Sequence, residues 1–450
     1  MNVKSNDSLD ALEKLLRQKP MTAASICKAM GITQSTLSRL WRQPGSSIIT
    51  LGAARATYYA IARTIPGLDA NLPVYRIGSD GKSSQFGLLR SLAAHWFAFT
   101  TLDGAPTFSE GLPYFLQDMR PQGFLGRLVP RQNQDLNLPE KITDWTDDHV
   151  LIYLVGRGDD VGGNLIVGDE ALLRFMTSRT GSKEDIVGIK QTEAAYPLLA
   201  DAAIRGESTG SSAGGEQPKF TAKIKTTKSD SLRHVIVKFS PPLSSPSGRR
   251  WADLLIAEHL AAQTLSDFGM LACTSRILAA DERLFLEVER FDRNGKNGRA
   301  PMVSFAGLDC LLAMLDSTWS NIAQQLVDNG MLSNSELEKI RLADLFGALI
   351  GNTDRHPGNM AFAWDEQNKL SLLPIYDMLP MTYRPNNQGE VVVKVFSVEG
   401  LALQNLGLLP IALKMADTFW QSVLQHTDIS AGFKVIADQH RQELRRLDDE

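Results

Sequence analysis

A nine-residue segment, Gly351–Asn359, constrains the fold of this chain more than any other feature. It reads Gly-Asn-Thr-Asp-Arg-His-Pro-Gly-Asn and places Asp354 and Asn359 five residues apart in a polar loop. Before the loop, Ser333 is a good N-cap for a helix whose apolar face runs up to the first glycine. After the loop, two short runs read as strands around a polar turn. The sequence therefore predicts that Asp354 and Asn359 sit between a helix and a hairpin, and that Asp377 follows the return strand.

Phosphoryl transfer explains why these residue types matter. The reaction needs magnesium across the phosphates and a carboxylate oriented at the attacking hydroxyl. Protein kinases place an Asp, an Asn five residues later and a second Asp in this order. Asp354 is therefore a candidate catalytic base, Asn359 and Asp377 are candidate ligands of Mg²⁺, and His356 is a candidate contact to the nucleotide. Asn and Asp also form ordinary turns, so the loop alone does not decide between the two interpretations.

A Ser/Gly-rich segment upstream supplies a second part of a nucleotide site. Its small residues can bring backbone N–H groups close to phosphate oxygens. The candidate contacts are Ser211, Ser212, Ala213, Gly214 and Gly215. Two strands are expected to follow, and the second carries Lys238, which would reach the α- and β-phosphates. Glu258, on a helix expected to begin near Trp251, is a candidate ion-pair partner for Lys238.

Further motifs occur along the chain in a recognisable order. They are Tyr114–Leu116, Arg120–Gly123, Gly156–Gly163, Ser211–Lys219, Glu289–Arg293, Asn352–His356 with Asn359, and Tyr376-Asp377. In this order they resemble the HipA family of serine/threonine kinases, the toxins of bacterial type II toxin–antitoxin modules. The similarity covers roughly residues 70 to 440, which is most of the chain.

The resemblance implies an α+β fold, a HipA-like two-lobed protein kinase that uses ATP and Mg²⁺. It gives Asp354 the role of catalytic base and Lys238 a contact to the nucleotide phosphates. It also places Glu289 and Phe291 against the adenine, in a hinge between the lobes.

The resemblance further implies a self-regulating phosphorylation. In relatives, a serine at the position of Ser211 becomes autophosphorylated, which switches the kinase off; the neighbouring Ser212 makes the site ambiguous here. A phosphate dianion on this loop would repel the phosphates of ATP, so the mechanism is physically reasonable.

The first 65 residues have a different character from the rest. They hold nine Lys and Arg against three Asp and Glu, whereas the remainder holds 38 against 48. A helix over residues 21–30, a turn at Gly31 and a helix over residues 33–43 form a helix-turn-helix pattern, and residues 46–50 could start a wing. The outer face of the second helix carries side chains able to reach bases and phosphates, namely Gln34, Ser35, Thr36, Ser38 and Arg39. We expect DNA binding, although such helices also serve as packing or dimerisation units.

These patterns predict three domains. They are a helix-turn-helix DNA-binding domain with a candidate wing over residues 1–66, a HipA N-terminal subdomain over 67–195, and a kinase domain over 196–450 with an ATP-binding lobe and a helical lobe. In the HipA family, DNA recognition lies in a separate antitoxin, so the fused domain leaves the need for an antitoxin open.

The cysteine content and the lack of long apolar runs indicate the cellular compartment. Cys27, Cys273 and Cys310 show no CxxC spacing, and their odd number favours a reducing compartment without disulfides or structural zinc. The N-terminus has no apolar signal core, and no run is long enough to span a membrane. We therefore expect a cytoplasmic protein.

Two other functions fit parts of the sequence. One is a DNA-binding transcription regulator whose kinase-like domain only senses nucleotide, but Lys238, Asp354 and Asp377 are all present. The other is a small-molecule kinase, which the Ser211 loop and the hinge motif disfavour. The resemblance suggests a protein substrate, and relatives act on aminoacyl-tRNA synthetases, but no residue here encodes that choice.

Overall fold

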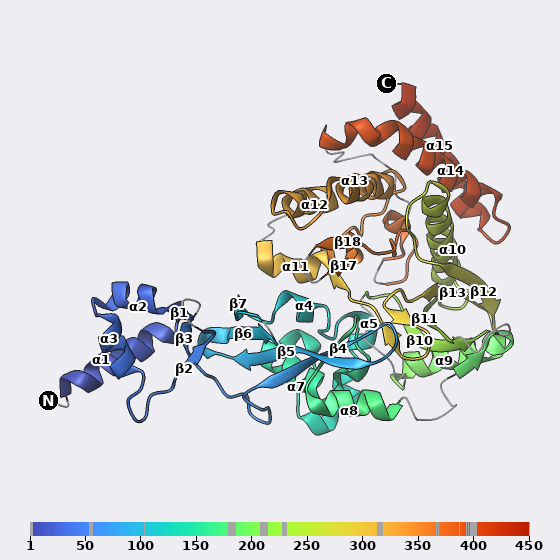
Figure 1. Cartoon of the computed structure of the whole chain (residues 1–450). Coiled ribbons are helices and arrows are strands. Elements are labelled where there is room, and N and C mark those ends of the chain that lie inside the picture. Colours follow the sequence, from blue (N-terminus) through green and yellow to red (C-terminus); the bar gives the residue numbers. More distant parts are fainter. Residues whose placement is uncertain are drawn as a thin grey trace.

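The computed structural model describes residues 3–53, 57–102, 104–178, 186–207, 215–226, 232–312, 318–365, 367, 369–386, 388–392, 394, 396 and 403–449. Three units follow one another in an elongated molecule (Figure 1). We call them the N-terminal unit (residues 3–61), the middle unit (72–178) and the two-lobed unit, which has a sheet lobe (186–289) and a helical lobe (293–449).

The N-terminal unit packs three helices against a small antiparallel sheet of strand order β1-β3-β2. Thr22 and Thr33 cap the second and third helices, because their hydroxyl oxygens accept backbone N–H bonds at 3.3 and 3.2 Å. The elements are α1 (Val3–Leu16), β1 (Met21–Thr22), α2 (Ala23–Met30), α3 (Gln34–Leu40), β2 (Ile48–Leu51) and β3 (Tyr58–Ile61).

Both helices expected in this unit are shorter than the sequence suggested. The first begins at Ala23 because Met21 and Thr22 pair with β3 as a short strand. The second ends at Leu40, three residues before the expected end at Gln43.

The middle unit is built on a five-stranded antiparallel sheet of order β7-β6-β5-β4-β8. Its strands are β4 (Leu72–Ile77), β5 (Ser83–Ser91), β6 (Trp96–Thr101), β7 (Thr107–Glu110) and β8 (Leu165–Val167). Its main helices are α4 (Tyr114–Gln117), α5 (Gly123–Gly126), α6 (Val129–Gln132), α7 (Asp147–Arg157) and α8 (Asp169–Ser178). A small apolar cluster joins this sheet to the N-terminal unit, and within it Ala60 of β3 packs with Ala98 of β6.

The sheet lobe has five strands in the order β12-β13-β11-β10-β9, and only β9 and β10 pair in parallel among them. Its elements are β9 (Ile186–Gly188), α9 (Thr192–Arg205), β10 (Lys219–Lys225), β11 (Leu232–Phe239), α10 (Pro246–Asp267), β12 (Ser275–Ala280) and β13 (Arg283–Glu289). The helix that carries Glu258 begins at Pro246 and not near Trp251, because the Ser245 hydroxyl caps it at 3.0 Å from Gly248 N. The boundary expected at residue 195 falls inside α9, whose Tyr196 is buried in this lobe.

The helical lobe contains the predicted helix, loop and hairpin. Its elements are α11 (Phe305–Leu312), α12 (Trp319–Asp328), α13 (Asn334–Leu349), the 3₁₀ turn η8 (Pro357–Asn359), β17 (Ala361–Trp364), β18 (Leu370–Leu372), α14 (Leu409–Gln425) and α15 (Ala431–Asp449). Short strands β14 (Arg293–Asn294), β15 (Gly298–Arg299) and β16 (Val303–Ser304) precede them. Ser333 caps α13 as expected, since its Oγ accepts the N–H of Glu336 at 3.2 Å.

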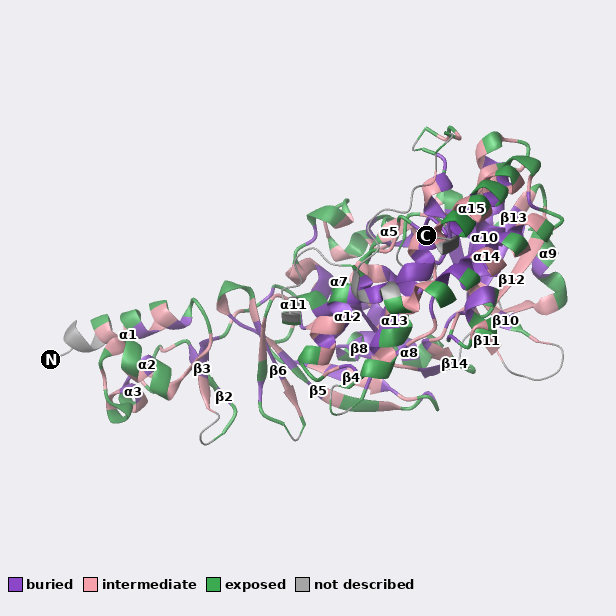
Figure 2. Cartoon of the chain, turned by 90° about the horizontal axis from the view of Figure 1, so that it is seen from above, coloured by how far each residue is buried: buried purple, intermediate pink, exposed green. Residues whose placement is uncertain are grey.

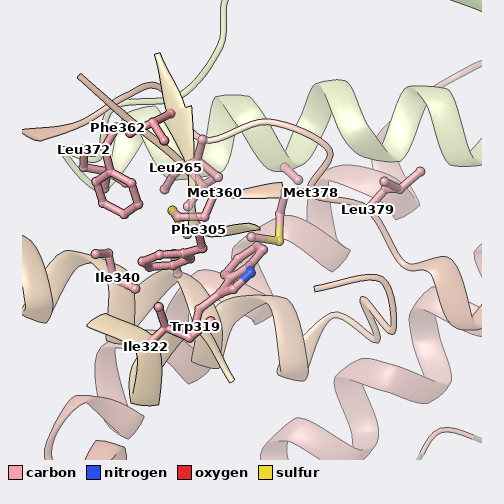
Figure 3. Packing of buried hydrophobic residues seen from close by; sticks show 14 of the residues in the cluster. Leu265, Phe305, Trp319, Ile322, Ile340, Met360, Phe362, Leu372, Met378 and Leu379 are labelled. Atoms are coloured by element: carbon pink, nitrogen blue, oxygen red, sulfur yellow. The ribbon is translucent and has the colours of Figure 1, made fainter. Parts of the chain in front are cut away.

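The buried core is largest in the helical lobe and thinnest in the N-terminal unit (Figure 2). Phe305, Trp319, Ile340 and Phe362 belong to one buried apolar cluster of this lobe (Figure 3). Among the described residues, no helix combines the length and apolar composition that a membrane span requires.

Candidate nucleotide-binding and catalytic site

A cavity of about 730 Å³ lies between the sheet lobe and the helical lobe. Side chains from segments far apart in the sequence form its walls. The residues singled out in the sequence that line it are Gly215, Lys238, Glu289, Phe291, His356, Asn359 and Asp377. One cavity therefore collects polar groups from both lobes, as a ligand bound between them would require.

Lys238 is buried on β11, and two carboxylates hold its ammonium group. Its Nζ donates to Glu258 Oε1 and to Asp377 Oδ1, each at 2.5 Å. Burial alone would lower the pKa of Lys238, but the carboxylates of Asp377 and Glu258 outweigh it and raise the pKa above its usual value. Lys238 is therefore a fixed cation between a helix of one lobe and a loop of the other.

Asp377 supplies a negative charge to the same wall. Burial would raise the pKa of its carboxyl group, but the ammonium groups of Lys238 and Lys219 hold that pKa below its usual range. Its backbone has φ +53°, where a residue other than glycine is uncommon. Backbone strain of this kind often occurs where a side chain must hold a functional position.

Asn359 and Asp377 could hold a cation together. Asn359 is buried, and its Nδ2 donates to the carbonyl oxygen of Asp354 at 2.9 Å. A cation in the cavity would therefore meet the amide oxygen of Asn359. Among the described residues, no three His, Cys, Asp or Glu side chains form a metal-binding group. One carboxylate and one amide fit a Mg²⁺ ion that takes its remaining ligands from phosphates and water.

Hydrogen bonds made by the side chains of Asn352 and Arg355 fix the first half of the loop that carries Asp354. Asn352 is 1% exposed, and its Oδ1 accepts the N–H of Asp354 at 2.9 Å. Arg355 donates to the carbonyl oxygen of Asn352 and, at 3.0 Å, to the buried carboxylate of Asp344. Asp354 itself is half-buried and does not line the cavity, whereas Arg355 and His356 do.

The second half of the loop is held by two aromatic side chains. Trp319 Nε1 donates to the carbonyl oxygen of His356 at 3.0 Å, and the Tyr376 hydroxyl donates to that of Gly358 at 2.7 Å. His356 Nδ1 accepts the N–H of Gly358 at 3.0 Å. These bonds fix the main chain between Asp354, the candidate catalytic base, and Asn359.

The end of β13 and the segment after it form another wall of the cavity. Glu289 and Phe291 line the cavity there, and the rings of Phe291 and Tyr376 lie 5.7 Å apart. Ile236 and Val288 add aliphatic surface to the same wall. The flat face of an aromatic ring, such as that of a nucleobase, could pack against both aromatic and aliphatic side chains here.

The Ser/Gly loop is described only at its end. Ser211, Ser212, Ala213 and Gly214 lie outside the described residues, and Gly215 is the first residue after them. Gly215 lines the cavity beside Lys219, the lysine that closes this motif.

Sequence reasoning missed Lys219 as a site residue. It is 3% exposed, and burial lowers the pKa of its ammonium group to about 8, although the carboxylate of Asp377 opposes the shift. The sequence signal that could have identified Lys219 is its position directly after a proline, at the end of the Ser/Gly motif. Asp118 and Gln122 of the middle unit also line the cavity; Gln122 lies in the Arg120–Gly123 motif, whereas no sequence signal indicated Asp118.

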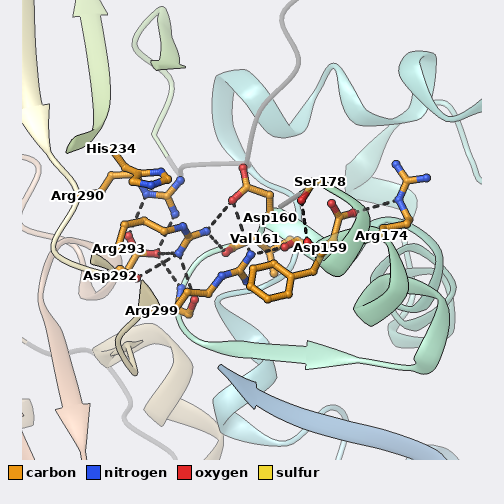
Figure 4. A network of polar contacts seen from close by, with 12 residues as sticks. Asp159, Asp160, Val161, Arg174, Ser178, His234, Arg290, Asp292, Arg293 and Arg299 are labelled. Atoms are coloured by element: carbon orange, nitrogen blue, oxygen red, sulfur yellow. Dashed lines mark hydrogen bonds and ion pairs between the residues drawn. The ribbon is translucent and has the colours of Figure 1, made fainter. Parts of the chain in front are cut away.

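A network of charged side chains connects the middle unit to the segment after β13; Asp292 and the arginines beside it are buried, whereas Asp160 is half-exposed (Figure 4). Asp292 accepts bonds from Arg290 at 2.9 and 2.8 Å, from Arg293 at 2.6 Å and from the N–H of Gly163 at 2.9 Å. Arg293 also donates to Asp160 at 2.9 Å. Burial would raise the pKa of the Asp292 carboxyl group, but the two arginines hold that pKa below its usual range.

The predicted DNA contacts lie at the other end of the molecule, on α3 (Figure 1). Gln34, Ser35 and Arg39 are exposed, and Thr36 and Ser38 are partly buried. They are not part of the cavity between the lobes.

Comparison with known proteins places the chain in a family. Residues 68–176 match a family model described as "YjjJ-like toxin, middle domain", and residues 211–441 match one described as "HipA-like C-terminal domain". Toxin YjjJ of Escherichia coli (strain K12) is 35% identical over 444 residues, covering 98% of each chain. The chain belongs to the HipA-like toxin family.

A solved structure from the family shows the same fold. Shewanella oneidensis MR-1 HipA, determined in a complex with HipB and its operator DNA, aligns with a TM-score of 0.52 at 16% identity. The alignment covers 83% of this chain and 97% of that HipA chain. The mixed α/β architecture is thus that of HipA, and the matched HipA-like domain contains the loop with Asp354 and the strand with Lys238.

Proposed function

We propose that the protein is an ATP- and Mg²⁺-dependent serine/threonine protein kinase of the HipA toxin type. The observation that carries the proposal is the double ion pair of Lys238 with Glu258 and Asp377 in the wall of the cavity. A fixed ammonium group beside a charged carboxylate suits a polyphosphate accompanied by a divalent cation.

The remaining residues have complementary roles in this proposal. Asp377 and Asn359 hold Mg²⁺, which neutralises charge on the phosphates when it is bound. Lys238, with Gly215 at the end of the Ser/Gly loop, binds those phosphates, and Glu289 and Phe291 meet the adenine.

Asp354 orients the hydroxyl group of the substrate. Its half-buried position outside the enclosed cavity suits a group that must meet a second, larger molecule. The Asn352 and Asn359 bonds to its backbone keep it in register with the metal ligand. Ser211 or Ser212 is the proposed site of autophosphorylation, and a protein is the proposed external substrate.

Incubation with Mg-ATP tests the kinase. Wild type is compared with Asp354→Ala and with Asp267→Ala, which removes an exposed carboxylate at the end of α10. Intact mass and phosphopeptide mapping should show one added phosphate on Ser211 or Ser212 in wild type and Asp267→Ala only. Unmodified wild type that also fails to bind ATP would exclude the enzyme and a regulator that senses ATP, and would leave only DNA binding by the N-terminal unit.

We also propose that the N-terminal unit binds DNA. The order helix, strand, two helices and then two antiparallel strands is that of a winged helix-turn-helix, and the exposed Arg39 and Gln34 lie on its third helix, α3. The excess of basic residues in the first 65 positions provides the attraction to phosphates.

Duplex DNA binding at several salt concentrations tests this role. Arg39→Ala should weaken binding about tenfold, whereas Arg445→Ala, at an exposed arginine of α15, should leave it unchanged. Equal affinities for all three proteins, or affinity that does not fall with salt, would contradict a DNA contact through α3.

A further inference from the structure

The turn that begins α5 in the middle unit touches the end of the Ser/Gly loop. The N–H of Phe124 donates to the carbonyl oxygen of Gly215 at 2.9 Å. Gly215 is the first described residue after the loop, and it lines the cavity together with Gln122 from the same turn. A segment 92 residues earlier in the chain therefore borders the phosphate end of the candidate site.

The contact depends on two glycines that face each other. A Cβ atom on Gly123 would lie 2.4 Å from the carbonyl oxygen and 2.6 Å from the nitrogen of Gly215. Real Cβ atoms do not approach other atoms so closely, and both neighbours here are backbone atoms that cannot swing away. Gly123 also has φ +66°, which favours glycine. Any side chain at position 123 would therefore push Gly215 out of its present place.

Gly215 has the ammonium group of Lys219 as a second neighbour. A Cβ atom on Gly215 would lie 2.8 Å from Lys219 Nζ, so the backbone at Gly215 passes between the α5 turn and this ammonium group. A displacement of Gly215 would change the cavity wall that Gly215 and Lys219 form together.

Two side chains anchor the turn to the sheet lobe on either side of the glycine contact. Phe124 packs against the apolar core of that lobe, in the cluster that contains Phe220. Arg127 forms an ion pair with Glu216, the residue after Gly215. The middle unit thus holds the end of the loop by a backbone bond, an apolar contact and a charge pair.

We propose that Gly123 is a positioning residue for the phosphates of the nucleotide, because the α5 turn fixes Gly215 and its neighbour Lys219 in the cavity wall that meets them. The inference rests on the proposed function, because it assumes that the cavity binds ATP. It adds that the middle unit, and not the two lobes alone, sets the affinity for the phosphate groups. The adenine wall, at Glu289 and Phe291, does not contact this turn and should be unaffected.

Titration calorimetry with Mg-ATP and with adenosine separates the two ends of the pocket. Gly123→Ala should bind Mg-ATP about tenfold more weakly than wild type and bind adenosine equally well. The matched control is Gly67→Ala, because Gly67 also has a positive φ (+83°) but a Cβ atom there meets nothing within 4 Å. It should bind both ligands as wild type does while carrying the same backbone strain.

Each outcome decides the point. Folded Gly123→Ala with wild-type affinity for Mg-ATP, or with equal losses for Mg-ATP and adenosine, overturns the positioning role and leaves the proposed function intact. Wild type that binds no Mg-ATP overturns the proposed function and this inference with it.

If Gly123→Ala does not fold, variants that exchange the charges of Arg127 and Glu216 provide a second test. Arg127 and Glu216 are both exposed, so Arg127→Glu should fold and should weaken Mg-ATP binding about threefold without changing adenosine binding. Combining it with Glu216→Arg should restore the wild-type affinity. Unchanged Mg-ATP affinity in Arg127→Glu, or no recovery in the double variant, would count against the proposal.

Discussion

The middle unit meets both ends of the candidate nucleotide pocket, but it uses different interactions at each. At the proposed adenine end, Asp292 is 5% exposed; Arg290 and Arg293 of its own segment hold it, and the middle unit adds the N–H of Gly163 (Figure 4). At the proposed phosphate end, a single backbone bond to Gly215 is supported by the packing of Phe124 and by an ion pair whose side chains are 52% and 70% exposed. Buried, multiply bonded charges resist rearrangement, whereas exposed pairs are weak.

The difference suggests a division of roles within one pocket. The adenine wall is built as a rigid surface, because every oxygen of Asp292 has a charged donor and none can move without exposing an unpaired charge. The polar contacts at the proposed phosphate end are weaker, because its ion pair is exposed to solvent.

The largest expected effect comes from breaking the adenine end. Asp292→Ala leaves Arg290 and Arg293 without their shared carboxylate in a buried place, so we expect the free energy of unfolding to fall by about 3–5 kcal/mol. Urea unfolding followed by circular dichroism measures it. Asp80→Ala, which removes an exposed partner of Lys82, is the control and should unfold like wild type. If the free energy of unfolding changed by a similar small amount in both variants, the claim that this end of the pocket is rigid would be contradicted.

An intermediate effect is expected from titrating Lys219 at the phosphate end. The pKa of its ammonium group is lowered to about 8 in the folded protein, so the group loses its proton as the pH rises through that value. Phosphates favour the charged form, and affinity for Mg-ATP should therefore fall about tenfold between pH 7.5 and 9. Calorimetry at several pH values tests this.

Lys219→Gln is the control for the titration. Because its side chain is neutral at both pH values, the Lys219→Gln variant should bind Mg-ATP with the same low affinity at pH 7.5 and at pH 9. A wild-type affinity that does not change with pH, or a Lys219→Gln variant that keeps the full dependence, would show that another group is responsible.

The smallest expected effect is on stability at the phosphate end. Arg127→Ala removes the exposed pair with Glu216, and we expect a loss of less than about 1 kcal/mol in the free energy of unfolding. The same urea series measures it beside Asp292→Ala. A loss as large as that of Asp292→Ala would remove the distinction between the two ends.

The local parts of the site were predictable from the sequence. Ser333 and the apolar pattern after it located α13, and the alternation around Lys238 located β10 and β11. These signals depend on neighbouring residues, so one sequence is enough to read them.

The tertiary parts were not predictable in this way. The contact of Gly123 with Gly215 and the burial of Lys219 depend on how distant segments pack. The expected start of α10 near Trp251 was late because its cap, Ser245, lies in a Pro- and Ser-rich stretch that does not show the apolar period of a helix. The four residues Ser211–Gly214 lie outside the described residues, so their roles stay predictions.

The most direct test of the account is whether ATP binding in this cavity depends on magnesium through Asp377. Calorimetry compares ATP with and without Mg²⁺ for wild type and Asp377→Asn, after thermal unfolding confirms that both are folded. We predict that Mg²⁺ tightens binding at least about tenfold in wild type and has no effect in the variant. Binding that ignores Mg²⁺ in wild type, or that keeps its full Mg²⁺ dependence in Asp377→Asn, would contradict the proposed site.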